Sequence, residues 1–167
     1  MWRAAIWGRP FASDGSSGNN GPTLNTEQTQ VPAIEGWFTT APPALIGTRC
    51  RQCGSYFFPP ERALCRNPAC VSTDLEDTEL STRGRIWSFS VNHYAAPEPY
   101  VGKDPFEPYT VVAAELVSEQ MVVLGQLASD VDPSKLAIGD EVDVTIEPLF
   151  VDEDGQEHLV WKWKPVS

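Results

Sequence analysis

The sequence is poor in the residues that most often carry out catalysis or bind phosphates. It holds two histidines, His93 and His158, and 12 lysines and arginines against 23 aspartates and glutamates. It has no Gly-rich phosphate loop and no nucleophile motif with an adjacent base. Of the net charge of −11, a net −9 falls on residues 80–167, and an acidic surface repels phosphate backbones. We therefore expect no catalytic site in this chain alone and no nucleic-acid binding.

Long hydrophobic runs are missing as well. No stretch of about 18 apolar residues is present, which is the length that a membrane-spanning helix needs. Residues 1–10 lack the apolar segment of a secretory signal. We therefore expect a cytoplasmic protein that does not cross a membrane. In that reducing compartment, cysteines bind metal more readily than they form disulfides.

The four cysteines lie within 21 residues, in the pattern C-x2-C-x11-C-x4-C. They are Cys50, Cys53, Cys65 and Cys70. This spacing predicts a structural Zn²⁺ site, because four thiolates complete a tetrahedral shell and leave no position for water or substrate. Gly54 allows a positive φ after the first pair, where its amide can reach a sulfur, and Asn67-Pro68 provides the turn of the second pair. Iron in a rubredoxin-like site and a redox dithiol are the alternatives.

Composition divides the chain into three parts. Residues 1–33 are rich in Gly, Ser, Asn and Thr, which predicts a flexible tail. Residues 34–79 contain an N-terminal segment and the zinc ribbon, with a short helical turn expected around Trp37 and Phe38. Residues 80–167 change to a pattern of strands.

The C-terminal part predicts a mostly β fold with five strands. The expected strands cover residues 85–94, 109–117, 121–128, 141–149 and 158–164, with one helical turn at residues 133–136 capped by Asp132. This pattern fits a five-stranded Greek-key barrel of the OB type, with a small β-sandwich as the alternative.

Side-chain alternation predicts the faces of these strands. One face of the first strand carries Trp87, Phe89, Val91 and His93, and the inward faces of the last two carry Val142, Val144, Ile146, Leu159, Trp161 and Trp163. Gly84 and Gly125 are expected at bulges or bends. Residues 95–108, which contain four prolines, form either a binding loop or a cover over the barrel.

Taken in order, several short motifs resemble a known family. They are the first cysteine pair with Gly54, Phe57-Phe58-Pro59-Pro60, the second cysteine pair, and the segments at residues 84–89, 104–109, 122–126 and 138–142. Over residues 36–166 this order resembles domain-of-unknown-function family thirty-five, which joins a rubredoxin-like zinc ribbon to an OB fold. The commoner form of the family has two residues, rather than four, between Cys65 and Cys70.

The resemblance implies a role as a partner subunit. Family members form hetero-oligomers with thiolase-superfamily enzymes, and the motifs most resemble partners of lipid-transfer-protein-type aldolases in steroid side-chain degradation. In such a complex the thiolase-like subunit supplies the catalytic residues, and a coenzyme A thioester is the substrate of the complex. The accessory chain would stabilise the enzyme and help to form its acyl-CoA site.

Coenzyme A carries phosphates, so a site for it on this chain needs cations and apolar contacts. The candidate CoA-binding residues are Arg83, Arg85, Tyr100, Lys103 and Phe106. The alternative function is an OB-fold and zinc-ribbon module for single-stranded nucleic acid, in which Trp87, Phe89 and Tyr94 would stack on bases. The acidic C-terminal part opposes this alternative.

Overall fold

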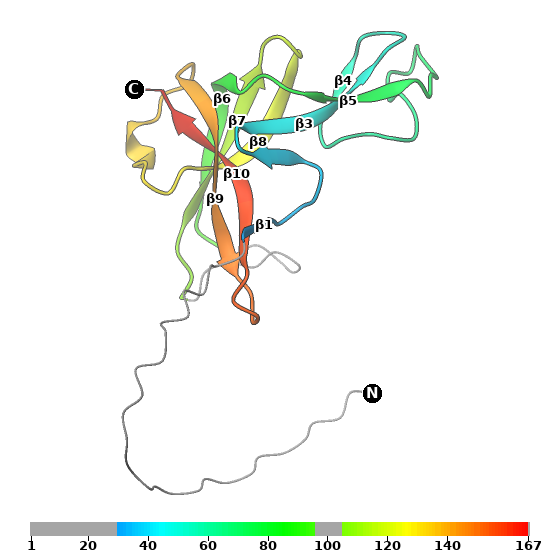
Figure 1. Ribbon diagram of the computed structural model, residues 1–167. Coiled ribbons are helices and arrows are strands. Elements are labelled where there is room, and N and C mark those ends of the chain that lie inside the picture. The colour runs from blue at the N-terminus through cyan, green and yellow to red at the C-terminus, as the bar shows by residue number, and fades with distance from the viewer. Residues whose placement is uncertain (1–29, 96–104, 167) are drawn as a thin grey trace, which may run out of the picture.

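The computed structural model describes residues 30–95 and 105–166, which form ten strands and one short 3-10 helix (Figure 1). Nearly all of the predicted tail lies outside these residues. Its last part, Gln30–Pro32, forms β1, which pairs in parallel with β10. In the described part of the chain, no helix has the length and apolar character needed to cross a bilayer.

Five strands close into a barrel. They are β6 (Arg83–Asn92), β7 (Tyr109–Leu116), β8 (Met121–Leu127), β9 (Glu141–Val151) and β10 (Glu157–Pro165). The hydrogen-bonded order is β6-β7-β8-β10-β9, and β9 pairs back with β6. The β8–β10 pairing is parallel, and the other pairings around the barrel are antiparallel. Closure confirms the OB-type barrel over the sandwich.

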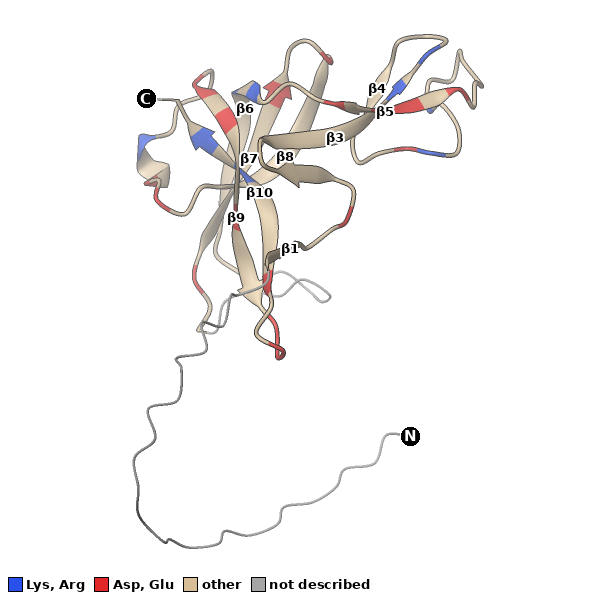
Figure 2. Cartoon of the chain, viewed as in Figure 1, with Lys and Arg blue, Asp and Glu red and all other residues tan. Residues whose placement is uncertain are grey.

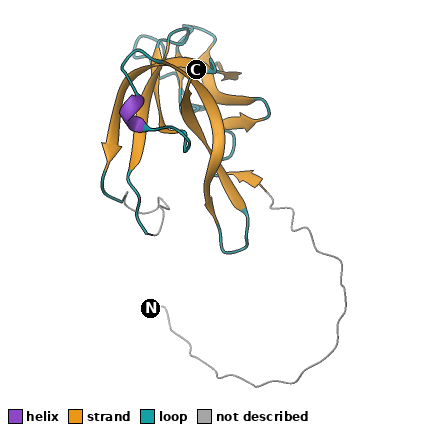
Figure 3. Ribbon diagram, turned by 90° about the vertical axis from the view of Figure 1, so that its left-hand side faces the viewer, coloured by secondary structure: helices purple, strands orange, loops and turns teal. Residues whose placement is uncertain are grey.

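A single turn of 3-10 helix connects the third and fourth strands of the barrel. It is η1 (Pro133–Lys135), and it is the purple element in Figure 3. The Asp132 carboxylate accepts a hydrogen bond of 2.9 Å from the Ser134 amide, as expected for an N-cap. The predicted helical turn and its cap are therefore confirmed.

The barrel interior is built on the inward faces of β9 and β10. Val142 and Trp163 are fully buried there, and Leu159 is 5% exposed. Gly125 of β8 lies against this core, since a Cβ atom at Gly125 would come within 2.9 Å of the Trp163 indole. The β7–β8 register is regular at Gly125, so of the expected bulge or bend no bulge occurs there. This glycine allows the large Trp163 ring to approach the backbone.

A bulge does occur in β6, between Ile86 and Ser88. Ile86 pairs with Ala114 and Ser88 pairs with the adjacent Ala113, so Trp87 is one extra residue. The bulge shifts the side-chain alternation by one position. Ile86 is buried and Phe89 packs on the same core, whereas Trp87 is 62% exposed. The prediction that Trp87 and Phe89 share a face is therefore wrong.

The N-terminal unit consists of short strands around one longer strand. They are β2 (Phe38–Thr40), β3 (Pro43–Cys50), β4 (Tyr56–Phe57) and β5 (Leu75–Glu79). The expected helical turn at Trp37 and Phe38 is wrong, because Phe38 begins β2 and pairs with Leu45 of β3. Burial of Phe38 and pairing with β3 outweigh the local preference of this short segment.

The N-terminal unit contributes to the barrel core at one end and has a separate small cluster around the cysteines at the other. Strand β3 runs from Leu45, which packs with the barrel residues, to Cys50 in the ribbon. Trp37, Phe58 and Trp161 form an aromatic cluster across the junction, with the Phe58 and Trp161 ring centroids 5.5 Å apart. These contacts fix the ribbon against the barrel. Figure 1 shows the ribbon strands β4 and β5 at its upper right, beside the barrel.

A buried ion pair lies outside the barrel interior, between β9 and β10. The Lys162 ammonium donates to the Glu147 carboxylate at 2.9 Å and to the Ser129 hydroxyl at 2.7 Å. Burial alone raises the pKa of Glu147, but the hydrogen bonds from Lys162 and Ser129 outweigh it and leave this pKa below its ordinary value of 4.5.

Replacing Glu147 by Gln should lower the free energy of unfolding at neutral pH by about 1–3 kcal/mol, because a buried ammonium loses its carboxylate. A carboxyl whose pKa is lower in the folded state stabilises the fold above its unfolded pKa and loses this effect as pH falls. The difference between wild type and variant should therefore be constant above about pH 6 and shrink below about pH 4.5. Urea titrations across this range measure it. Glu153→Gln, in an exposed turn, is the control, and equal stability losses for both variants would contradict the assignment.

Candidate metal centre

The four cysteine sulfurs gather at one end of the ribbon. All four Sγ atoms lie within 4.8 Å of one another. The Cys50 and Cys70 sulfurs are 3.9 Å apart, and the Cys53 and Cys65 sulfurs are 3.6 Å apart. A tetrahedral zinc with Zn–S bonds of about 2.3 Å has sulfur–sulfur edges of roughly 3.8 Å. The thiolates are therefore arranged to hold Zn²⁺, and the predicted set of ligands comes together in space.

Backbone hydrogen bonds shape the first cysteine pair. Cys50 leaves β3, and its amide donates to the Ser55 carbonyl at 2.9 Å. Gly54 has φ of +76°, which confirms the predicted left-handed residue. Its amide donates at 2.8 Å to the Cys50 carbonyl, rather than to a sulfur as expected. This hydrogen bond closes a turn over residues 50–54, which brings the Cys53 side chain close to that of Cys50.

The second pair closes through the predicted Asn67-Pro68 turn. The Asn67 side-chain oxygen accepts from the Ala69 amide at 3.0 Å, and its carbonyl accepts from the Cys70 amide at 2.8 Å. This local network accommodates four residues between Cys65 and Cys70. The longer spacing therefore still brings both sulfurs to the centre.

The environments of the four thiols differ. Cys50, Cys65 and Cys70 are buried beneath Phe57 and Leu75, whereas Cys53 is exposed. Hydrogen bonds from the Ser55 hydroxyl and amide lower the pKa of Cys53 to about 6, and burial raises the pKa of Cys65 to about 12. Metal binding must displace the protons of the buried thiols, so the affinity for zinc decreases as the pH is lowered.

The arginines around the ribbon pair mainly with carboxylates. Arg51 donates to Glu76 at 2.8 Å, Arg66 donates to Glu61 at 2.6 Å, and Arg62 donates to Asp77 at 3.0 Å. The Arg49 guanidinium lies over the Tyr56 ring at 5.7 Å from its centroid. Three of the four ribbon arginines are thus paired with nearby carboxylates. Figure 2 shows positions of both charge signs along the ribbon.

The candidate CoA-binding residues are only partly described. Tyr100 and Lys103 lie outside the described residues. Arg83 makes a bidentate pair with Asp143 at 2.7 and 2.8 Å, and this hydrogen bonding lowers the pKa of Asp143. Phe106 is 39% exposed before β7.

Arg85 also has a carboxylate neighbour, since one of its guanidinium nitrogens lies 3.9 Å from a Glu141 oxygen. Both barrel arginines on the candidate list thus face carboxylates of β9. CoA binding by these residues stays a prediction.

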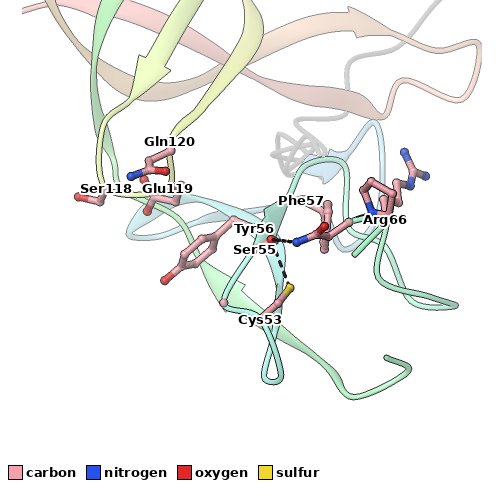
Figure 4. Close-up of a pocket in the computed structure, with 11 residues that line it drawn as sticks. Cys53, Ser55, Tyr56, Phe57, Arg66, Ser118, Glu119 and Gln120 are labelled. Carbon is pink, nitrogen blue, oxygen red and sulfur yellow. Dashed lines mark hydrogen bonds between the residues drawn. The ribbon is translucent and has the colours of Figure 1, made fainter. Parts of the chain in front are cut away.

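A cavity that the sequence did not indicate lies between the ribbon and the barrel. It has a volume of about 550 Å³ and is lined by residues 53–57 and 66–68 of the ribbon and by the barrel turn 118–120. Figure 4 shows the Ser55 hydroxyl within it, in contact with Cys53 and with the Asn67 amide. Its residues are mainly polar, and it forms because the β7–β8 turn projects toward the ribbon.

Two family models match the two structural units, in the order in which they occur along the chain. The family model described as "ChsH2, rubredoxin-like zinc ribbon domain" matches residues 41–76, and "ChsH2, C-terminal OB-fold domain" matches residues 77–147. A "DUF35 domain-containing scaffold protein" of Methanocaldococcus jannaschii is 32% identical over 127 residues, covering 74% of this chain and 82% of the relative. The chain belongs to the DUF35 family. Its metal centre is the structural zinc site of a rubredoxin-like ribbon.

Other DUF35 relatives include subunits of enzymes. The "Benzoylsuccinyl-CoA thiolase subunit BbsA" of Geobacter metallireducens is 30% identical over 125 residues, covering 75% of this chain and 77% of the relative. A solved structure titled "Ltp2-ChsH2(DUF35) aldolase" matches with a TM-score of 0.57 and 26% identity, covering 81% of this chain and 98% of that chain.

Contacts within the structure explain the Phe-Phe-Pro-Pro segment between the cysteine pairs. Phe57 packs against the buried cysteines, and Phe58 packs against Trp161 of the barrel. Neighbouring residues of one short segment thus contact the metal centre and the barrel core. The segment therefore joins the two units.

Proposed function

We propose that this protein is a non-catalytic accessory subunit of a thiolase-superfamily enzyme, which it binds and stabilises. The observation that carries the proposal is the closed shell of four thiolates in a chain related to a thiolase subunit and to a component of an aldolase. A shell filled by protein ligands leaves the zinc no position for substrate. The metal then holds the ribbon in place, and the partner breaks the bond.

The finer part of the proposal concerns the substrate. We propose that the complex cleaves a coenzyme A thioester in steroid side-chain degradation, by aldol or thiolytic chemistry, and that this subunit helps to form the acyl-CoA site. The partner is then a lipid-transfer-protein-type thiolase. The relation to a benzoylsuccinyl-CoA thiolase subunit supports a CoA thioester, and the relation to the Ltp2-ChsH2 aldolase supports the type of partner.

Co-expression with the thiolase-like proteins encoded near this chain tests the proposal. We expect co-elution on size exclusion, and cleavage of an acyl-CoA only when both chains are present. Thioester cleavage by this chain alone, or a stable catalytic subunit that is fully active without it, would overturn the proposal.

Binding of single-stranded DNA, which tests the nucleic-acid alternative, is measured with the same preparation. Single-strand binding on an OB fold needs a cationic groove with exposed aromatic rings. Arg83 and Arg85 lie beside carboxylates instead. Binding of poly-dT that weakens steeply with salt, without binding to any thiolase-like protein, would favour the alternative.

A further inference from the structure

Large apolar side chains are exposed on the outer face of β6, β7 and β8. Trp87 of β6 is 62% exposed, and Leu124 and Val122 of β8 are 61% and 42% exposed. A lone exposed apolar residue needs no explanation, but a cluster on one sheet face is typical of an interaction site. We call the outer surface formed by Trp87, Val122 and Leu124, together with Ala113, which is only 7% exposed, the apolar face.

The strand register brings these residues together. Ser88, Ala113 and Leu124 stand opposite one another on β6, β7 and β8. Neighbouring strands are about 4.8 Å apart, so Leu124 lies roughly 10 Å from the β6 backbone, with the small side chain of Ala113 between them. Val122 precedes Leu124 by two positions and therefore points to the same side. The apolar face is thus a compact strip across three strands.

The β6 bulge places two consecutive residues, Trp87 and Ser88, on this side of the sheet. Because Ile86 is in the core, alternation puts Trp87 on the outer face. The extra residue keeps Ser88 on that face as well, opposite Ala113, and returns Phe89 to the core. Bulges commonly re-aim a side chain at a functional site. Tryptophan is also the residue type most enriched among those that dominate binding energy at protein interfaces.

The charges around the apolar face indicate the nature of its occupant. Arg85 lies beside Glu141 and stands opposite Glu115 in the register. A polyanionic ligand that bound here would be repelled by the carboxylates of Glu115 and Glu141 next to the apolar strip. A second copy of this chain would add a further net charge of −11, and such like charges oppose association. The face fits a different protein, with apolar side chains at its centre and neutral or cationic side chains around them.

We infer that the apolar face, with Trp87 and Leu124 as its anchors, is the surface that binds the catalytic partner subunit. This inference rests on the proposed function and adds the location of the contact. An apolar centre with a charged rim is the usual anatomy of a protein–protein interface. The site lies on the barrel, away from the four thiolates, so docking does not depend on direct contact with the zinc.

The test compares two double variants in the full-length protein. Trp87→Ser with Leu124→Ser removes the anchors, and Val71→Ser with Ile138→Ser removes two aliphatic side chains that are 80% and 73% exposed elsewhere. Zinc content and thermal unfolding establish that each variant is folded. Affinity for the co-expressed thiolase-like subunit is measured by titration calorimetry. We expect the anchor variant to raise Kd at least 30-fold, and the control to change it less than threefold.

The outcomes separate the inference from the function. If wild type binds the thiolase-like subunit and the folded anchor variant binds within threefold of it, the apolar face is not the contact, and the accessory role stands. If wild type binds no thiolase-like protein, both proposals fail. If wild type self-associates through Trp87 and Leu124, as measured by sedimentation of the isolated chains, the occupant is a second copy and the inference is overturned.

Discussion

Replacing Cys50 by Ser should reduce the zinc content from about one ion per chain to nearly none. Cys50 is fully buried at the end of β3, with its sulfur 3.9 Å from that of Cys70. A serine hydroxyl does not supply the thiolate that the site needs, and structural zinc sites provide about 10–16 kcal/mol of apparent binding energy in isolated zinc-finger peptides. The ribbon should therefore unfold and the protein become largely insoluble. Elemental analysis of the soluble fraction measures the loss.

Two comparisons make this result specific. Val71→Ser changes an exposed residue beside Cys70 and should keep full zinc content and solubility. A strong chelator should destabilise wild type and the Val71 variant alike. A soluble Cys50 variant with one tightly bound zinc would show that the four thiolates are not the ligand set.

Replacing Trp163 by Ala should lower the free energy of unfolding by about 3–5 kcal/mol. Trp163 is fully buried on β10, and its indole fills the space that Gly125 leaves open on β8. Truncation leaves a large cavity that a closed barrel cannot collapse to fill. Since domains of this kind are stable by only about 5–15 kcal/mol, the melting temperature should fall by roughly 10 °C or more.

The matched control for Trp163 is another tryptophan in the same barrel. Trp87→Ala removes the same side chain from an exposed site and should change the free energy of unfolding by less than about 0.5 kcal/mol. Calorimetry of both variants gives the comparison. A Trp87 variant that loses as much stability as the Trp163 variant would contradict the assignment of inner and outer faces.

Local pattern was sufficient for the metal centre and for most of the strands. The cysteine spacing, Gly54 and the Asn67 turn act within a few residues of one another, so the sequence carries the geometry directly. Alternation on β9 and β10 likewise placed Val142 and Trp163 inside, because the large apolar side chains of both strands recur at every second residue. The cap at Asp132 is equally local.

Other features depend on contacts between distant segments. The extended conformation of Phe38 depends on its burial in the barrel core as well as on pairing with Leu45, and the extra residue that separates Trp87 and Phe89 onto different faces appears only in the pairing of β6 with β7. The cavity between the units requires the β7–β8 turn to reach the ribbon. The barrel core, β7 and the β7–β8 turn lie far along the chain from the residues that they contact here, so periodicity alone did not reveal these features.

The sequence by itself determined which residues bind the metal and where the barrel strands lie, because these depend on spacing and alternation along the chain. The order of its short motifs carried the resemblance to the family. The tertiary structure alone decided how the ribbon packs on the barrel through Phe58 and Trp161, why Gly125 is a glycine, and which side of β6 exposes Trp87. The physical reason is that each of these depends on a side chain or backbone from another strand, and those neighbours meet only when the barrel closes.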